Sequence, residues 1–109
     1  MPRYDIQPKS AEAYVDLVNQ AIIEVEELKA SYEFDMEDAG AHFAYLNPLL
    51  EQLQTLRQQM ADGSYYFDSS DLPFMEIANR YKSLIPFSSL LAMINHTHRH
   101  GLAVDESAP

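Results

Sequence analysis

The chain has 109 residues, with 17 acidic against 7 basic side chains, a formal net charge of −10 and 47% apolar residues. This length suits one domain with its own core, and the absence of cysteine excludes disulfides, thiolate metal sites, iron–sulfur clusters and thiol catalysis. The negative charge repels phosphate backbones and anionic lipid surfaces, so we expect no direct binding to nucleic acid or to a membrane.

The first predicted helix follows a short arm. Residues 1–9 contain two prolines and no sustained periodicity, which indicates an extended conformation. Ser10 suits the N-cap position because its hydroxyl can accept a hydrogen bond from a free N–H of the first turn. After it, apolar side chains recur at alternating spacings of four and three: Tyr14, Val18, Ala21, Val25, Leu28 and Tyr32. This period predicts a helix over about residues 10–32 with one apolar face.

A second helix is predicted over about residues 36–61, after a corner near Phe34. Apolar residues again recur every three or four positions: Met36, Ala39, Phe43, Leu46, Leu50 and Leu53. Pro48 interrupts this pattern, since a proline inside a helix removes one hydrogen bond and clashes with the preceding turn. Because the apolar register stays in phase across Pro48, we expect one kinked helix that stops at Gly63.

The connection over residues 62–72 is polar but carries three consecutive aromatic residues, which we expect to pack across one end of the helices. Ser70 or Asp71 then caps a third helix that starts near Pro73 and ends at Gly101. Pro86 either bends or divides this third helix. Residues 102–109 form a predicted flexible tail.

Three amphipathic helices joined by short connections must bury their apolar faces against one another. The predicted fold is therefore all-α: a single helical domain over residues 1–109, built as an antiparallel bundle of three long helices. If Pro48 and Pro86 split their helices, the same sequence gives four or five shorter ones.

Seven acidic residues are concentrated within fifteen positions, with Lys29 as the only basic residue among them. They are Glu24, Glu26, Glu27, Glu33, Asp35, Glu37 and Asp38. Such a cluster either docks a partner with a basic surface or forms a solvated face without a specific role. The spacing does not match the twelve-residue calcium loop, which requires a glycine at its sixth position.

Tyr65, Tyr66 and Phe67 form the aromatic run before the third helix. Tyrosine offers a large contact area at a low entropic cost, so this run is a candidate surface for binding a partner. The alternative interpretation is a lid, in which the three rings cover the core.

The candidate metal ligands are histidines: His96, His98 and His100 near the C-terminus, and His42 in the second helix. Residues two apart on a helix diverge by about 200°, so only one or two of the C-terminal imidazoles can share a face. A frayed helix end could still gather two of them around zinc, nickel or copper, with His42 or a carboxylate completing the set. The alternative is that His98, Arg99 and His100 interact with the free carbonyls at the helix C-terminus, which favour cations.

No nucleophile elbow, no serine–histidine–acid arrangement and no phosphate-binding glycine loop occurs in the sequence, so we expect neither independent enzyme activity nor a cofactor. The lack of a secretory signal and of a membrane-length apolar run indicates the cytoplasm. We therefore expect a small acidic module that binds another protein, as a regulator, adaptor or accessory subunit. The alternatives are a metal-binding protein that uses the C-terminal histidines, and a homo-oligomer such as a helical homodimer.

Overall fold

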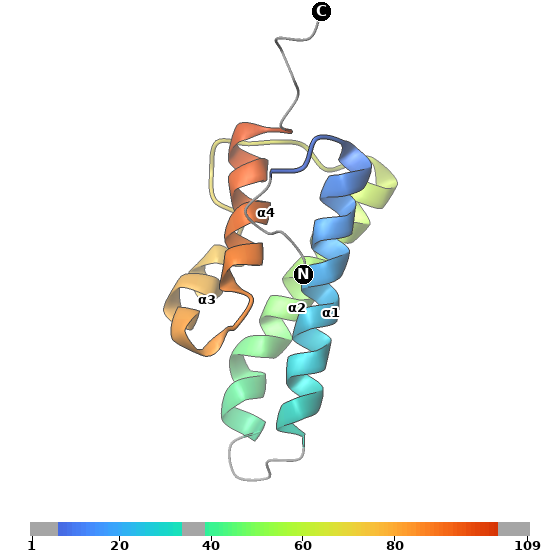
Figure 1. Cartoon of the computed structure of the whole chain (residues 1–109). Coiled ribbons are helices and arrows are strands. Elements are labelled where there is room, and N and C mark those ends of the chain that lie inside the picture. Colours follow the sequence, from blue (N-terminus) through green and yellow to red (C-terminus); the bar gives the residue numbers. More distant parts are fainter. Residues whose placement is uncertain (1–6, 34–38, 103–109) are drawn as a thin grey trace, which may run out of the picture.

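The structure, a computed structural model, describes residues 7–33 and 39–102. Within these ranges the fold is all-helical and contains no strand. Its elements are α1 (Ala11–Tyr32), α2 (Ala39–Asp62), α3 (Met75–Arg80), the short 3-10 helix η1 (Lys82–Leu84) and α4 (Ser88–His100). In Figure 1, α1 and α2 lie side by side, α4 packs along the upper half of α1, and α3 lies below α4. No helix in the described ranges carries an apolar stretch of the length that crossing a lipid bilayer takes.

Helix α1 begins where its N-cap was predicted. The hydroxyl of Ser10 accepts a hydrogen bond from the backbone N–H of Ala13 at 3.1 Å, which satisfies one of the free donors of the first turn. The predicted apolar face is buried through Tyr14, Val18, Ala21, Ile22 and Val25. Of the predicted arm, Pro8 is buried and the side-chain amide of Gln7 donates to the carbonyl of Gly101. Residues 1–6 lie outside the described part.

Helix α2 runs through Pro48 without ending, so the expectation of one continuous helix is confirmed. Proline removes the hydrogen bond to the carbonyl of Ala44, and both Ala44 and Asn47 are exposed, so water can reach that carbonyl. The helix stops at Gly63, which has a φ of +81°. The N–H of Ser64 then closes the end by donating to the carbonyl of Gln59 at 3.0 Å. The predicted corner near Phe34 falls outside the described residues.

Of the two alternatives for the third segment, the structure shows the divided one, because α3, η1 and α4 replace a single long helix. Pro86 divides rather than bends the segment. Steric contact with the proline ring drives Ile85 into an extended conformation, with φ −105° and ψ +105°, and α4 restarts at Ser88. The predicted cap of α3 is wrong, since Phe74 occupies that position and no side chain caps the helix. Gly101, with a φ of +84°, ends α4 as predicted.

The core lies where the three longer helices meet. Helix α1 packs against both α2 and α4, and the buried leucines of α2 and α4 belong to one cluster with the apolar face of α1. The fully buried members include Val18, Val25, Leu46, Leu49, Leu53, Leu90, Leu91 and Ile94. Phe74, at 1% exposure, fills the core from the segment before α3. Leu102, where the predicted tail begins, is half-buried against this core, and residues 103–109 lie outside the described part.

Candidate functional site

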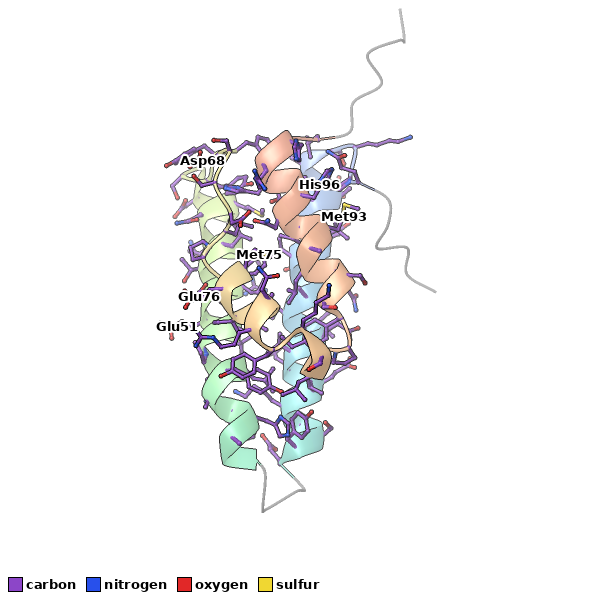
Figure 2. The ribbon with its side chains drawn as sticks, turned by 90° about the vertical axis from the view of Figure 1, so that its left-hand side faces the viewer. Glu51, Asp68, Met75, Glu76, Met93 and His96 are labelled. Atoms are coloured by element: carbon purple, nitrogen blue, oxygen red, sulfur yellow. The ribbon has the colours of Figure 1, made fainter. Side chains whose placement is uncertain are left out.

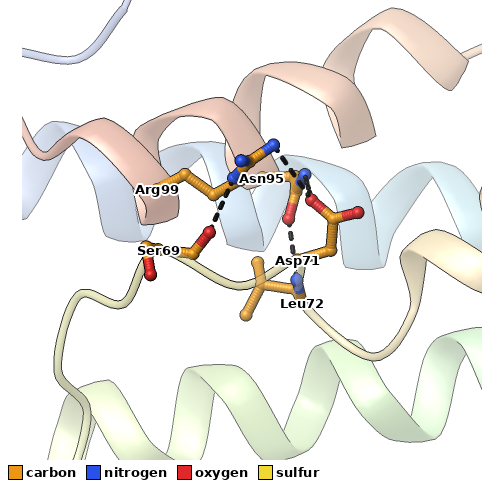
Figure 3. A network of polar contacts seen from close by, with 5 residues as sticks. All are labelled: Ser69, Asp71, Leu72, Asn95 and Arg99. Carbon is orange, nitrogen blue, oxygen red and sulfur yellow. Dashed lines mark hydrogen bonds and ion pairs between the residues drawn. The ribbon is translucent and has the colours of Figure 1, made fainter.

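Residues 64–73, which we call the clamped loop, join α2 to α3 and are tied to α4 by polar side chains (Figure 3). Asn95, only 8% exposed, accepts a hydrogen bond from the N–H of Leu72 at 2.7 Å and donates to the carboxylate of Asp71 at 3.0 Å. Arg99 donates through Nε to the carbonyl of Ser69 at 2.9 Å and forms an ion pair with Asp71 at 3.4 Å. Because a buried amide must be hydrogen-bonded, Asn95 strongly favours this one position of the loop.

A second connection runs through the interior by way of Tyr65. Its hydroxyl lies 3.0 Å from the hydroxyl of Tyr14 on α1 and 2.8 Å from Nδ1 of His98 on α4. The hydroxyl of Tyr14 in turn donates to the carbonyl of Ile94 at 3.0 Å. The loop therefore contacts both α1 and α4 through hydrogen bonds of a single tyrosine.

The direction of this chain of hydrogen bonds follows from counting protons. Each hydroxyl has one proton, and that of Tyr14 is used on the carbonyl of Ile94. Tyr65 must then donate to Tyr14, and the remaining bond requires an N–H on Nδ1 of His98. All three bonds are satisfied together only with this tautomer, which leaves Nε2 of neutral His98 with a free lone pair.

Burial sets the charge state of these groups. Desolvation lowers the pKa of His98 below its ordinary value, and the negative charges of Asp68 and Asp71 only partly oppose this effect. Burial likewise raises the pKa of the Tyr14 and Tyr65 phenols. At neutral pH the imidazole and both phenols are therefore uncharged, which suits a hydrogen-bonded interior.

The structure separates the three residues of the aromatic run. Tyr65 is half-buried in the interior, and Phe67 stacks on Tyr14 with ring centroids 6.0 Å apart while remaining 45% exposed. Tyr66 points away from the core and is 72% exposed. Tyr65 and Phe67 thus have the geometry of a lid, whereas Tyr66 has that of a surface contact.

A cavity of about 330 Å³ opens beside the clamped loop. Its walls include Gln59, Ser64, Tyr66, Asp68, Ser70 and His98. Asp68 is fixed at this position because its backbone N–H donates to the carbonyl of His98 at 3.2 Å. The cavity therefore combines an aromatic ring, a carboxylate and a buried imidazole.

The described members of the acidic cluster lie on the C-terminal half of α1 and at the residue that directly follows it. Glu26, Glu27 and Glu33 are exposed and Glu24 is half-buried; none of the four forms an ion pair with another described residue. The nearby ammonium of Lys29 lies 5.6 Å from the ring centre of Phe43. This half of α1 is the end remote from the clamped loop (Figure 1), so the two predicted surfaces are separate. Asp35, Glu37 and Asp38 fall outside the described residues.

The predicted metal ligands are only partly brought together. The rings of His96 and His100, both exposed, have centroids 4.5 Å apart. His98 instead turns inward to Tyr65, and His96 and Asp68 lie on different sides of α4 in Figure 2. His42 lies at the far end of the molecule, stacked on Tyr32 at 3.6 Å and hydrogen-bonded to Tyr45 at 2.8 Å. Over residues 7–33 and 39–102, no three histidine or acidic side chains are grouped as metal ligands.

Sequence reasoning missed the polar side of α4 that holds the loop. Asn95, His98 and Arg99 are spaced by three and by one, which places them on one helical face. That spacing was the available signal, because a cluster of hydrogen-bonding side chains beside an apolar stripe favours contact with a polar loop. Comparison of the chain with protein-family models, with curated proteins and with solved structures finds no match.

Proposed function

We propose that the chain is a non-enzymatic interaction module that binds another protein through the clamped loop. The observation that carries this proposal is the placement of Tyr66, a large aromatic side chain that is 72% exposed on a backbone held by Asn95 and Arg99. A tyrosine on a fixed backbone loses little conformational entropy on binding, and such residues contribute most to the affinity of protein interfaces.

The acidic residues of α1 support a partner with a basic surface. Glu26, Glu27 and Glu33 are exposed at the end remote from Tyr66, so we assign them to electrostatic steering rather than to direct contact. Charges outside the contact area mainly raise the association rate, whereas buried aromatic anchors mainly slow dissociation. The two surfaces therefore have distinguishable kinetic effects on the same complex.

In-cell photo-cross-linking tests this proposal. A photoreactive phenylalanine analogue is placed at position 66, and in a matched control at position 84, where Leu84 is 46% exposed on η1. We expect position 66 to capture one protein that position 84 does not capture. Identical products from both positions, or no intermolecular product from position 66, would contradict the proposal. Capture of a second copy of this chain would assign the surface to homodimerisation instead.

Metal binding is a second candidate function, favoured by the adjacent rings of His96 and His100. Two imidazoles one helical turn apart can chelate one zinc, nickel or copper ion. The proposed ligand set excludes His98, whose Nδ1 is hydrogen-bonded to Tyr65, and His42, which lies at the other end of the molecule. Calorimetric titration with each metal tests this candidate.

A further inference from the structure

The cavity beside the clamped loop is lined by polar groups that neither a lid over the core nor a flat contact surface would need. His98 lines it although the residue is only 7% exposed, and its Nδ1 is already used by Tyr65. No described residue forms a hydrogen bond with Nε2. The direction of the hydrogen-bond chain leaves a lone pair on this nitrogen. Nε2 is not fully enclosed by the described residues, so it is an accessible acceptor on the residue that lines the cavity.

The charge on the cavity wall also favours a ligand that donates hydrogen bonds. Asp71 is neutralised by Arg99, but the carboxylate of Asp68 forms no ion pair with any described residue. The ring of Tyr66 forms another part of the wall, and the face of an aromatic ring attracts cations. A lone pair, a carboxylate and an aromatic face together match a group that carries positive charge and only hydrogen-bond donors.

From this juxtaposition we propose that the cavity binds a primary alkylammonium group, supplied by a lysine side chain of the partner protein. A lysine ammonium has three donors and no acceptor, so it can satisfy Nε2 of His98 and the carboxylate of Asp68 at once. Its aliphatic stem packs against Tyr66. This inference rests on the proposed function, because it specifies what the partner places beside Tyr66.

NMR titration with Nα-acetyl-lysine methylamide tests the ammonium site directly. We expect saturable shifts of the backbone amides of Tyr66 and Asp68 and of the His98 ring. The uncharged analogue Nα-acetyl-norleucine methylamide should bind at least about tenfold more weakly, because it lacks charge-assisted hydrogen bonds. Equal binding of the two compounds, or the absence of saturable shifts, would overturn the site.

Matched variants locate the site within the chain. Asp68→Asn should weaken binding of the lysine derivative about threefold to fivefold, and Tyr66→Leu should weaken it about twofold to fivefold. Glu51→Gln removes the same charge as Asp68→Asn from an exposed position on α2 outside the cavity wall (Figure 2) and should change affinity by less than about 1.5-fold, because salt screens distant charges. Equal losses in Asp68→Asn and Glu51→Gln would reduce the site to general electrostatic attraction and overturn it.

The outcomes separate this inference from the proposed function. If position 66 cross-links a partner but the lysine derivative causes no shift, the cavity proposal alone fails. If the lysine derivative binds but position 66 captures no partner, the assignment to a partner's lysine fails together with the proposed function. In a captured complex, replacing the partner's lysine by methionine should restore the free-state chemical shift of His98.

Discussion

The hydroxyl of Tyr65 lies 2.8 Å from Nδ1 of His98, and this contact joins two residues that are 33 positions apart in the chain. Tyr65 belongs to the clamped loop and His98 to the last turn of α4. Together with Asn95 and Arg99, this contact gives a loop without regular secondary structure a defined position. The exposure of the neighbouring Tyr66 is therefore a consequence of the fold.

Removing the hydroxyl of Tyr14 should destabilise the protein. Tyr14→Phe leaves Tyr65 without its acceptor in the interior and removes the hydroxyl that donates to the carbonyl of Ile94. We expect the free energy of unfolding to fall by about 1–3 kcal/mol. Urea denaturation measures this change. Tyr66→Phe makes the same chemical change at an exposed position and should stay within about 0.5 kcal/mol of the original protein; equal effects would contradict the proposed hydrogen-bond chain.

Stability should depend on the protonation of His98. Burial lowers the pKa of His98 in the folded protein, so in acid the unfolded chain binds the proton more readily than the folded one. This contribution to stability is fully present above the unfolded value of about 6.5 and is lost as the pH falls through the lower folded pKa. Denaturation between pH 8 and pH 5 should show this decline, and His98→Gln should reduce it. An undiminished decline in His98→Gln would assign the effect to other groups.

Removing the side chain of Asn95 should loosen the clamped loop and destabilise the protein, whereas removing an exposed asparagine side chain should do neither. Asn95→Ala leaves the N–H of Leu72 without its acceptor and removes one of the hydrogen bonds to Asp71. We expect a loss of about 1–3 kcal/mol in unfolding free energy, with faster hydrogen exchange at Leu72. The control is Asn79→Ala at an exposed position on α3. Unchanged exchange at Leu72 in Asn95→Ala would show that the loop is held by other contacts.

Much of the fold follows from the sequence because the signals are local. The spacing of apolar residues from Tyr14 to Tyr32 and the cap at Ser10 define α1 within one residue of its predicted start. Gly63 and Gly101 end their helices because each adopts a positive φ that other residues rarely adopt. The in-phase apolar register on both sides of Pro48 correctly favoured one continuous helix.

The missed features depend on contacts between distant segments. Ser70 or Asp71 was expected to cap α3, but the carboxylate of Asp71 accepts a hydrogen bond from Asn95 and pairs with Arg99 instead. Likewise, the separation of His98 from His96 could be derived from the helical period, whereas its pairing with Tyr65 could not. The spacing of residues in the sequence predicts which faces a helix has, but it does not predict which loop covers each face.

Replacing Pro48 should stabilise α2. Pro48→Ala restores an N–H that can bond to the carbonyl of Ala44 and removes the steric conflict inside the helix. The gain in helix propensity outweighs the greater freedom of the unfolded chain, and we expect a net increase of about 1–2 kcal/mol. Thermal unfolding followed by circular dichroism measures this gain. A decrease would show that the shape imposed by the proline is needed for packing.

Metal binding at α4 should require only two of the histidines. His96→Ala or His100→Ala should abolish measurable affinity for zinc or nickel, because each removes half of the chelate. His42→Ala should leave the affinity unchanged, since this ring lies between Tyr32 and Tyr45 at the far end of the molecule. Calorimetry compares the variants. Affinity that survives the loss of both His96 and His100 would rule out this pair.

The proposals for Tyr66 and for the cavity both require that the backbone of the clamped loop is fixed. Backbone ¹⁵N relaxation measures this property residue by residue. We predict order parameters of about 0.85 for residues 65–72, equal to those of α4. Values below about 0.6 in this segment, with normal values in α4, would contradict the account, because a mobile loop could neither present Tyr66 nor hold Asp68 beside His98.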